Sequence, residues 1–226
     1  MFRIFVSIVY SDPFILYFKL YYMRYTGPKF KQCRREGVNL FGSEKYNIKK
    51  RRKLPGQHGA NQARLTEYGK LLRNKQLLKR LYQLTEKQFK KIVTEIALKY
   101  SKNNNIWHDY AVFQFLERRL DVIVLRAWFA NSIMQSRQMV THGHFSYNGV
   151  KHNIPSVFVK TGDVIKVKEW LQSSPLYKSQ NDSHQVPTRC KVNKKTLEIE
   201  VVDLPRRDDV TMPVDVLKVI EYYARA

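Results

Sequence analysis

Apolar residues recur at intervals of three and four between residues 116 and 127, a spacing that predicts a helix with one buried face. The apolar positions are Leu116, Leu120, Ile123, Val124 and Ala127. Arg119 and Arg126 lie seven residues apart, so they should share another face of this helix. The pattern therefore predicts a helix with a buried side and a basic side.

A second helix is expected from Ser132 to His142. Ser132 and Gln135 have the spacing of a capping box, in which the hydroxyl and the amide each accept a hydrogen bond from a backbone N–H of the first turn. Gly143 then ends the helix, because glycine tolerates the left-handed conformation of a C-terminal cap.

Alternating apolar and polar residues predict three short strands after this helix. Phe145 to Tyr147 and the residues from Lys151 onward should pair through Asn148-Gly149, a strong hairpin signal. After a turn at residues 161–163, residues 164–168 alternate valine or isoleucine with lysine and should form another strand. Two helices and a small antiparallel sheet thus make one compact module.

The flanking regions are less uniform. Residues 67–82 have the pattern of a helix with a basic side, and Thr85 with Gln88 begins another whose apolar stripe reaches Tyr100, before a break at residues 101–105. That stripe is better explained by packing than by a binding site. Residues 24–60 have few apolar side chains, so we expect extended chain with short helical pieces, ordered by whatever the segment binds. Residues 170–196 suggest a surface loop, and a strand signal resumes near Leu197.

The charge of the chain indicates what kind of partner it binds. The formal net charge is +22, and residues 24–110 alone carry 22 basic and 6 acidic side chains. Such a chain is unlike an ordinary cytosolic enzyme and requires a polyanionic partner. A hydrophobic fraction of 43% argues against disorder throughout. The two cysteines lie far apart in sequence, so no disulfide framework is expected.

The first 22 residues differ from the rest. They contain two apolar runs separated by Ser11, Asp12 and Pro13, and neither run has the ~20 apolar residues that a membrane-spanning helix needs. We expect no membrane association. The favoured start is Met23, with residues 1–22 a mis-assigned or lineage-specific extension.

The module resembles the RNA-binding module named after ribosomal protein S-four, which also occurs in some tyrosyl-tRNA synthetases and pseudouridine synthases. The resemblance rests on LERRLD (116–121), FANSIMQSRQMVTHGHFSYNG (129–149), IPS (154–156) and GDVIKV (162–167). The flanks extend it through MRYTGPKFKQCRREGVNLF (23–41), LPGQHG (54–59) and LPRRDDVTMPVDVLKVIEYYAR (204–225). In this order the segments resemble the bacterial and organellar ribosomal protein S-four family over residues 23–226.

The resemblance implies an α+β fold in which a basic extended N-terminal arm and a helical subdomain enclose the small α/β RNA-binding module. The implied division is a 1–22 extension, a 23–66 arm, a 67–112 helical subdomain, a 113–170 module, and 171–226 as loop, strand and a C-terminal helix that returns to the helical subdomain. No cofactor is implied.

The function implied is that of a structural constituent of the small ribosomal subunit, a primary binder of the 5′ domain junction of its ribosomal RNA. The family nucleates assembly of the subunit body and contributes to translational accuracy. Implied partners are small-subunit ribosomal RNA, neighbouring small-subunit proteins, especially the fifth, and messenger RNA near the entry channel. The expected location is the ribosome of a bacterial cytoplasm, or alternatively of an organellar matrix or stroma.

Two alternatives share the module: an RNA-modifying enzyme such as a pseudouridine synthase, and a ribosome-rescue protein. The first needs a separate catalytic domain, for which the ~57 residues after the module are too few. No nucleophile with a base and an orienting group is evident, so we expect no catalysis. Many family members bind zinc through four cysteines in the arm, whereas this arm keeps only Cys33, so no metal is expected. His142 and His144 alone make a poor metal site.

Arginine grips phosphate oxygens with a planar fork, so the arginines of the two module helices are candidate RNA ligands. We expect Arg118, Arg119, Arg126 and Arg137 to line one groove with Gln138, His142, His144, Asn148 and Lys151. One of Arg118 and Arg119 should instead form an internal salt bridge with Glu117 or Asp121.

The arm and the loop at residues 55–59 complete the predicted RNA-binding set, although the loop alone would also suit an ordinary surface turn and the run 49–53 a solvated tail. The remaining members of the predicted set are Arg24, Tyr25, Lys29, Arg34, Arg35, Lys50, Arg51, Arg52, Gly56, Gln57, His58, Gly59, Lys75, Ser132 and Gln135.

Overall fold

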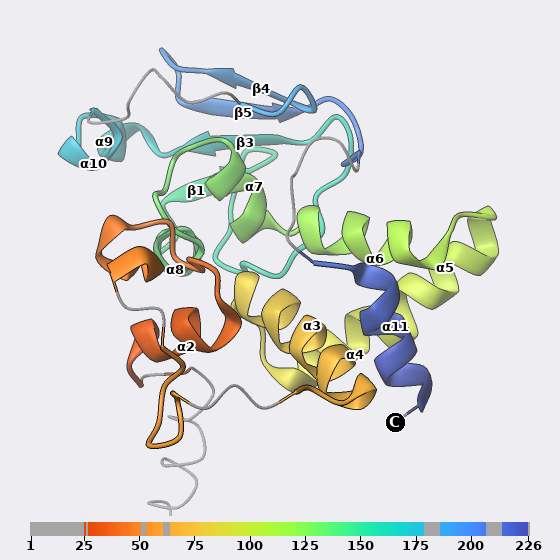
Figure 1. Cartoon of the computed structure of the whole chain (residues 1–226). Helices are drawn as coiled ribbons and strands as arrows, with labels where there is room; N and C mark the ends of the chain where they lie inside the picture. The colour runs from red at the N-terminus through yellow and green to blue at the C-terminus, as the bar shows by residue number, and fades with distance from the viewer. Residues whose placement is uncertain are drawn as a thin grey trace, which may run out of the picture.

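The structure is a computed structural model that describes residues 25, 27–50, 53–60, 64–178, 186–206 and 214–225. For Glu44, Lys50, Leu176 and Lys178 it describes only the backbone. Helices of both halves of the chain lie beside a small sheet (Figure 1), so the α+β class is confirmed.

The sheet has five antiparallel strands in the order β2-β1-β3-β5-β4. The strands are β1 (Phe145–Tyr147), β2 (Val150–Lys151), β3 (Val164–Val167), β4 (Cys190–Asn193) and β5 (Glu198–Val201). Along β3 and β5 the apolar residues Ile165, Val167, Ile199 and Val201 are buried, while the residues between them face away from the core. Helices α7 (Leu120–Arg126) and α8 (Ile133–Thr141) cover the apolar face (Figure 1).

The predicted helix across residues 116–127 is wrong, because the chain breaks at Arg118 and Arg119. Helix α6 (His108–Glu117) ends before these residues, and α7 begins after them. The backbone N–H groups of Leu120 and Asp121 donate to the carbonyls of residues 157 and 155 at 2.9 and 3.2 Å. A strand-like crossing by the segment 155–159 thus replaces the helical hydrogen bonds at this point.

Local signals elsewhere in the module are confirmed. Ser132 Oγ accepts from the N–H of Gln135, and the Gln135 side chain accepts from the N–H of Asn131 at 2.9 Å, one residue earlier than a standard capping box. The C-terminal cap places Gly143 at φ +70°, as predicted. The Asn148-Gly149 hairpin is also confirmed, with both residues at positive φ.

The helical body consists of α3 (Glu67–Leu81), α4 (Glu86–Lys91), the π-helical turn η3 (Ile92–Ile96), α5 (Ala97–Asn104), α6 and the C-terminal α11 (Val216–Arg225). Thr66 and Thr85 cap α3 and α4, so both predicted helix starts are confirmed. The predicted break at residues 101–105 is wrong, because α5 continues to Asn104 and ends at left-handed Asn105. Helix α11 packs on α3, with Val219 buried in the shared core. None of the helices within the described ranges is both apolar and long enough to cross a membrane.

The arm contains α2 (Lys29–Glu36) and the single turns η1 (Glu44–Tyr46) and η2 (Ile48–Lys50), so short helical pieces are confirmed. The expectation that only a partner could order the arm is wrong. Cys33, Leu40 and Phe41 form a small core with Leu77 of α3. Burial raises the pKa of the Cys33 thiol above its ordinary value, so this cysteine acts as a protonated core residue.

The expectation of a surface loop over residues 170–196 is wrong for residues 170–178 and 190–193, whereas residues 179–185 lie outside the described residues. Helices α9 (Glu169–Gln172) and α10 (Pro175–Lys178) follow β3 directly, and β4 precedes β5. Leu171, Tyr177 and Cys190 are buried in the core of the module. The apolar side chains are too widely spaced here for a periodic pattern, which is why the sequence did not reveal these elements.

Candidate nucleic-acid interface

Three parts of the fold meet around one groove. Helix α2 of the arm, the turn between α3 and α4, and the exposed side of α8 enclose a volume of about 1110 Å³. Its cationic lining residues are Lys31, Arg35, Lys79, Arg80 and Arg137. No part of the groove comes from the sheet, so the surface depends on how the arm and helical body are held against the module.

Glu86 is the acidic residue in this lining. Burial favours its neutral form, but hydrogen bonds from Lys75, Lys79 and Tyr223 outweigh burial and lower the pKa of Glu86 to about 2. The carboxylate therefore remains charged and is neutralised by lysines 2.6 and 2.9 Å away. The groove as a whole stays strongly positive, which suits an anionic ligand.

A buried carboxylate joins the arm to the helical body. Glu36, at the end of α2, has a side chain that is only 2% exposed. It accepts hydrogen bonds from Arg80 and, at 3.2 Å, from Arg73, both on α3. This contact fixes α2 against α3 and so sets one wall of the groove.

The loop at residues 53–60 forms part of the rim. Arg34 of α2 donates from Nε to the carbonyl of Lys53 at 2.8 Å and from Nη2 to that of Leu54 at 3.1 Å. A Cβ on Gly59 would collide with the carbonyl oxygen of Leu54, so only glycine allows this turn. Gln57 and His58 are exposed at its tip.

Basic side chains also gather at the C-terminal end of α8. A Cβ on Gly143 would lie 3.4 Å from Lys151 Cε and 3.8 Å from Lys168 Nζ, so both lysines approach this glycine. His142 is exposed, and the ring of His144 accepts or donates a hydrogen bond through Nδ1 to the Tyr177 hydroxyl at 3.1 Å. Burial, followed by electrostatic interaction with His142 and Lys168, lowers the pKa of His144. The cluster faces solvent beside the groove wall formed by α8.

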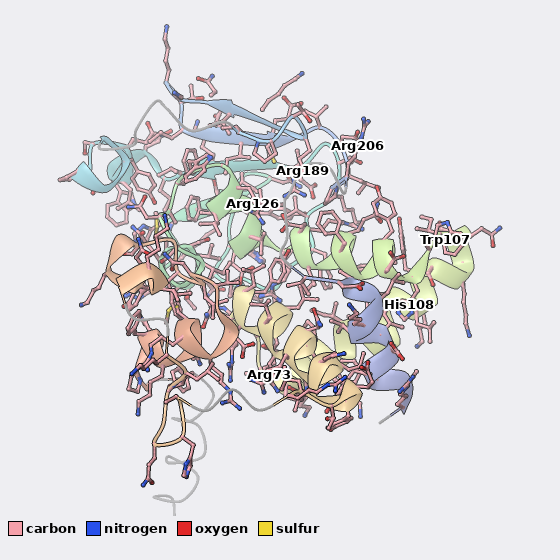
Figure 2. All side chains as sticks on the ribbon, viewed as in Figure 1. Arg73, Trp107, His108, Arg126, Arg189 and Arg206 are labelled. Atoms are coloured by element: carbon pink, nitrogen blue, oxygen red, sulfur yellow. The ribbon has the colours of Figure 1, made fainter. Side chains whose placement is uncertain are left out.

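Two buried carboxylates hold Arg119 and Arg126 of the module and Arg189 of the chain beyond it. Glu117 is fully buried and accepts from Arg126 at 2.8 and 3.1 Å, from Arg189 at 2.5 Å, and from the Tyr82 hydroxyl. Asp121 is also fully buried and accepts from Arg119 at 2.8 and 3.1 Å. Figure 2 shows Arg126 and Arg189 together where the sheet meets the helices.

Known proteins match this chain over most of its length. The family model for the ribosomal protein S4/S9 N-terminal domain matches residues 24–117, and the S4 domain model matches residues 118–165. The small ribosomal subunit protein uS4 of Thermoanaerobacter sp. (strain X514) is 42% identical over 210 residues, covering 89% of this chain and 99% of that protein. The chain belongs to the uS4 family. The uS4 proteins of Clostridioides difficile (strain 630) and Petrotoga mobilis, 39% and 38% identical, cover the same shares.

The uS4 family consists of ribosomal structural proteins and not of enzymes. The match to residues 24–117 lies almost entirely before the module, so it distinguishes this chain from enzymes and rescue proteins that share only the module. Within the described ranges, no group of three or more His, Cys, Asp or Glu side chains is placed to bind a metal.

The structure corrects the predicted arginine groove. Arg119 is 2% exposed and paired with Asp121, so it is not available to RNA. The prediction that either Arg118 or Arg119 forms an internal salt bridge is thus confirmed for Arg119. Arg126 is committed to Glu117, with 28% of its side chain exposed. Arg118 lies over the Phe115 ring and donates to the carbonyl of Val159, outside the groove.

Of the four module arginines that were expected to share one groove, Arg137 is the one that lines the groove described here. Its Nη1 donates to the carbonyl of Gln83 at 2.9 Å, and its Nε lies 3.4 Å from an Asp121 carboxylate oxygen. Arg137 thus joins α8 to the α3–α4 turn, with 19% of its side chain exposed. Lys75 is a further correction, because it is buried against Glu86 and the Tyr222 ring.

Other predicted residues have mixed positions. Tyr25 and Arg35 line the groove, while Lys29 and Ser132 line a separate hollow of about 370 Å³. Asn148 lies in the hairpin, where its amide links the turn to Asp163 and Val164. Exposed Gln138 lies on α8, whereas Gln135 is used in the cap. Arg24, Arg51 and Arg52, and the side chain of Lys50, lie outside the described residues, as does the whole 1–22 segment.

Sequence reasoning missed Lys31, Lys79, Arg80 and Lys168. The basic side of the helix at residues 67–82 was a signal for Lys79 and Arg80, but its periodicity alone did not say which partner that side would face. Lys168 was seen only as part of a strand.

Proposed function

We propose that this chain is a structural component of the small ribosomal subunit that binds small-subunit ribosomal RNA in the groove between arm, helical body and module. The observation that carries the proposal is the charge of the groove, which is lined by five cationic side chains and by one acidic residue, Glu86, that is paired with Lys79 of the lining and with buried Lys75. Membership of the uS4 family supports the same function.

The groove side chains divide into two kinds. Arg80 and Arg137 are held by protein acceptors, so they present guanidinium groups in fixed positions. Lys31 and Arg35 are exposed and, among the described residues, have no ion-pair partner, so they are free to neutralise phosphates. The fixed guanidinium groups of Arg80 and Arg137 would set the position of the RNA backbone. The exposed side chains of Lys31 and Arg35 would increase the affinity by releasing counterions from the phosphates.

We infer that the groove binds a folded RNA. The major groove of an A-form helix excludes side chains, so a protein reads backbone shape, 2′-hydroxyls and junction geometry. A groove shared by three parts of the fold suits a junction, where several strands approach from different directions. We therefore infer a junction in the 5′ domain of the small-subunit RNA, whose binding would nucleate assembly of the subunit body.

The finer assignments rest on family resemblance. They are contact with the fifth small-subunit protein and with messenger RNA near its entry channel, an influence on decoding accuracy, and a place on the ribosome of a bacterial cytoplasm or of an organelle. Bacterial relatives support the first location.

The test compares two double variants that remove the same charge. Lys31→Ala with Arg35→Ala removes two positive charges from the groove wall formed by α2. Lys191→Ala with Lys195→Ala removes two exposed lysines outside the groove, at β4 and the turn after it. Binding of the full chain to 5′-domain RNA and to a duplex of equal length is measured across a salt series.

The groove variant should bind 5′-domain RNA more weakly and lower the salt exponent by about 0.7 to 0.9 for each phosphate that is no longer neutralised. The control variant should bind almost as the unaltered chain does. Equal weakening by both variants, or equal binding to both RNAs, would mean that net charge alone is responsible and that the groove is not the site.

A further inference from the structure

Trp107 is the most exposed large apolar side chain among the described residues, with 82% of its surface in contact with solvent. It lies in the turn between α5 and α6, and Figure 2 shows it at the outer end of this helical hairpin, away from the sheet. It does not line the groove described above. A tryptophan is seldom left so exposed without a partner that covers its face.

The backbone beneath Trp107 is rigid. The π-helical turn η3 leaves the carbonyl of Val93 near His108, and His108 Nε2 lies 2.8 Å from that oxygen. Because a carbonyl can only accept, Nε2 carries the proton and donates. The turn itself is tight, with Asn105 left-handed and the N–H of Ile106 donating to the carbonyl of Ser101 at 3.1 Å. The backbone that carries the indole is therefore held in place, which limits the backbone entropy lost on binding.

A row of lysines leads to this tip. Lys87, Lys90 and Lys91 on α4 and Lys99 and Lys102 on α5 are all exposed, along one continuous helical segment roughly 20 Å long. None of the five makes an ion pair with any residue that the structure describes. Glu95 is the exposed acidic residue between Lys87 and Lys102, Glu86 before them is paired with Lys75 and Lys79, and Asp109 at the tip is buried. The surface is thus a positive track that ends at an aromatic platform.

We propose that this surface, the lysine row with Trp107, is a second RNA contact that takes a single-stranded segment, with an unpaired base stacked on the indole and its phosphates along the lysines. Base stacking on an aromatic side chain needs an unstacked base, so a duplex does not fit the tip. The inference rests on the proposed RNA-binding function, but it uses side chains that the groove does not.

Trp170 provides a matched control. It is 70% exposed, but it lies on α9 beside Glu169 and away from the lysine row. Full chains carrying Trp107→Ala, Trp107→Phe or Trp170→Ala are compared with the unaltered chain for binding to 5′-domain RNA and to an equal-length duplex. Since both tryptophans are exposed, each variant should keep the thermal midpoint of the unaltered chain.

Loss of one stacked base should weaken binding of Trp107→Ala to 5′-domain RNA by roughly 5- to 150-fold. Trp107→Phe should keep most of the affinity, because a phenyl ring also stacks, and Trp170→Ala should be unchanged. Duplex binding should not respond to any of the three. Lys99→Ala with Lys102→Ala should lower the salt exponent by about 0.7 for each phosphate left without its lysine.

Unchanged RNA binding by Trp107→Ala would overturn the inference. If that variant then failed to enter assembled subunits, the tip would be a protein contact instead. In either case weaker binding by the Lys31 and Arg35 variant would leave the proposed function standing, whereas failure of the unaltered chain to prefer 5′-domain RNA would refute the proposed function itself.

Discussion

Glu117 is the residue whose replacement should most disturb the fold. Its fully buried carboxylate binds Arg126 at the end of α7, Arg189 just before β4, and Tyr82 after α3. These residues belong to the module, to the chain beyond it and to the helical body. Glu117→Gln keeps the shape of the side chain and removes its charge, so it tests whether the ion pairs hold these parts together.

The expected loss of stability depends on the arginines that Glu117→Gln leaves without a charged partner. Removing one partner of a buried ion pair costs about 3–5 kcal/mol, because the other charge stays buried without compensation. Arg189 is 3% exposed and, in the described structure, two of its guanidinium nitrogens already have no acceptor. Arg126 is partly exposed, and glutamine still accepts one hydrogen bond, so we expect about 3 kcal/mol, the lower end. For a chain of this size that lowers the thermal midpoint by roughly 6–12 °C.

The stability effect should depend on pH. Burial favours the neutral form of Glu117, but Arg126 and Arg189 outweigh burial and hold the pKa of this carboxyl below its ordinary value of 4.5. A folded pKa below the unfolded one contributes stability that is present above pH 4.5 and is lost as the pH falls through the folded value. The difference between Glu117→Gln and the unaltered chain should therefore be full at neutral pH and shrink in acid.

Urea unfolding followed by circular dichroism, at neutral pH and at a series of acidic values, measures both effects. Glu198→Gln is the control, because it breaks a cross-strand pair with Lys166 that is about one third exposed and should change stability by no more than about 1 kcal/mol. Adding Arg189→Met to Glu117→Gln should restore part of the loss, since it removes the uncompensated charge. A Glu117→Gln chain as stable as the unaltered one at neutral pH would refute the reasoning.

Three further outcomes are expected. Gly59→Ala should weaken binding to 5′-domain RNA in a filter-binding assay without moving the thermal midpoint, because the new Cβ collides with the Leu54 carbonyl only within the rim loop. Ser132→Ala should lower the free energy of unfolding by about 1 kcal/mol in urea titrations, since it removes the cap of α8. Burial and the hydrogen bond to Asp163 raise the pKa of Tyr147 to about 12. Asp163→Asn should bring that pKa closer to 10, which ultraviolet titration of the phenol would detect.

Short-range signals predicted much of the module correctly. The cap at Ser132, the left-handed glycine at 143 and the Asn148-Gly149 turn each depend on residues within a few positions, so the sequence alone was sufficient. The break at Arg118 and Arg119 depends on hydrogen bonds to residues 155–159, about 40 positions away. Periodicity continues across such a break because both sides still need apolar residues, and it therefore suggested one helix where there are two.

The candidate site was harder to predict than the fold. A lysine or arginine has the same appearance in sequence whether it meets a phosphate or a buried carboxylate. The difference is set by distant partners: Arg189 lies 72 residues from Glu117, and Arg80 lies 44 from Glu36. The sequence revealed that the chain is basic, and only the fold separates the arginines that hold it together from those that face outward.

This separation also explains how the groove can be both positive and rigid. Glu36 fixes α2 against α3, and Asp121 with the carbonyl of Gln83 fixes Arg137 between α8 and the α3–α4 turn. Each wall is therefore positioned by a buried acceptor before any ligand arrives, so less conformational entropy is lost when RNA binds. Glu36 and Asp121 reduce the net charge of the chain, but both carboxylates are buried. The exposed positive charge lies on the groove walls, and these same carboxylates determine how far apart the walls are.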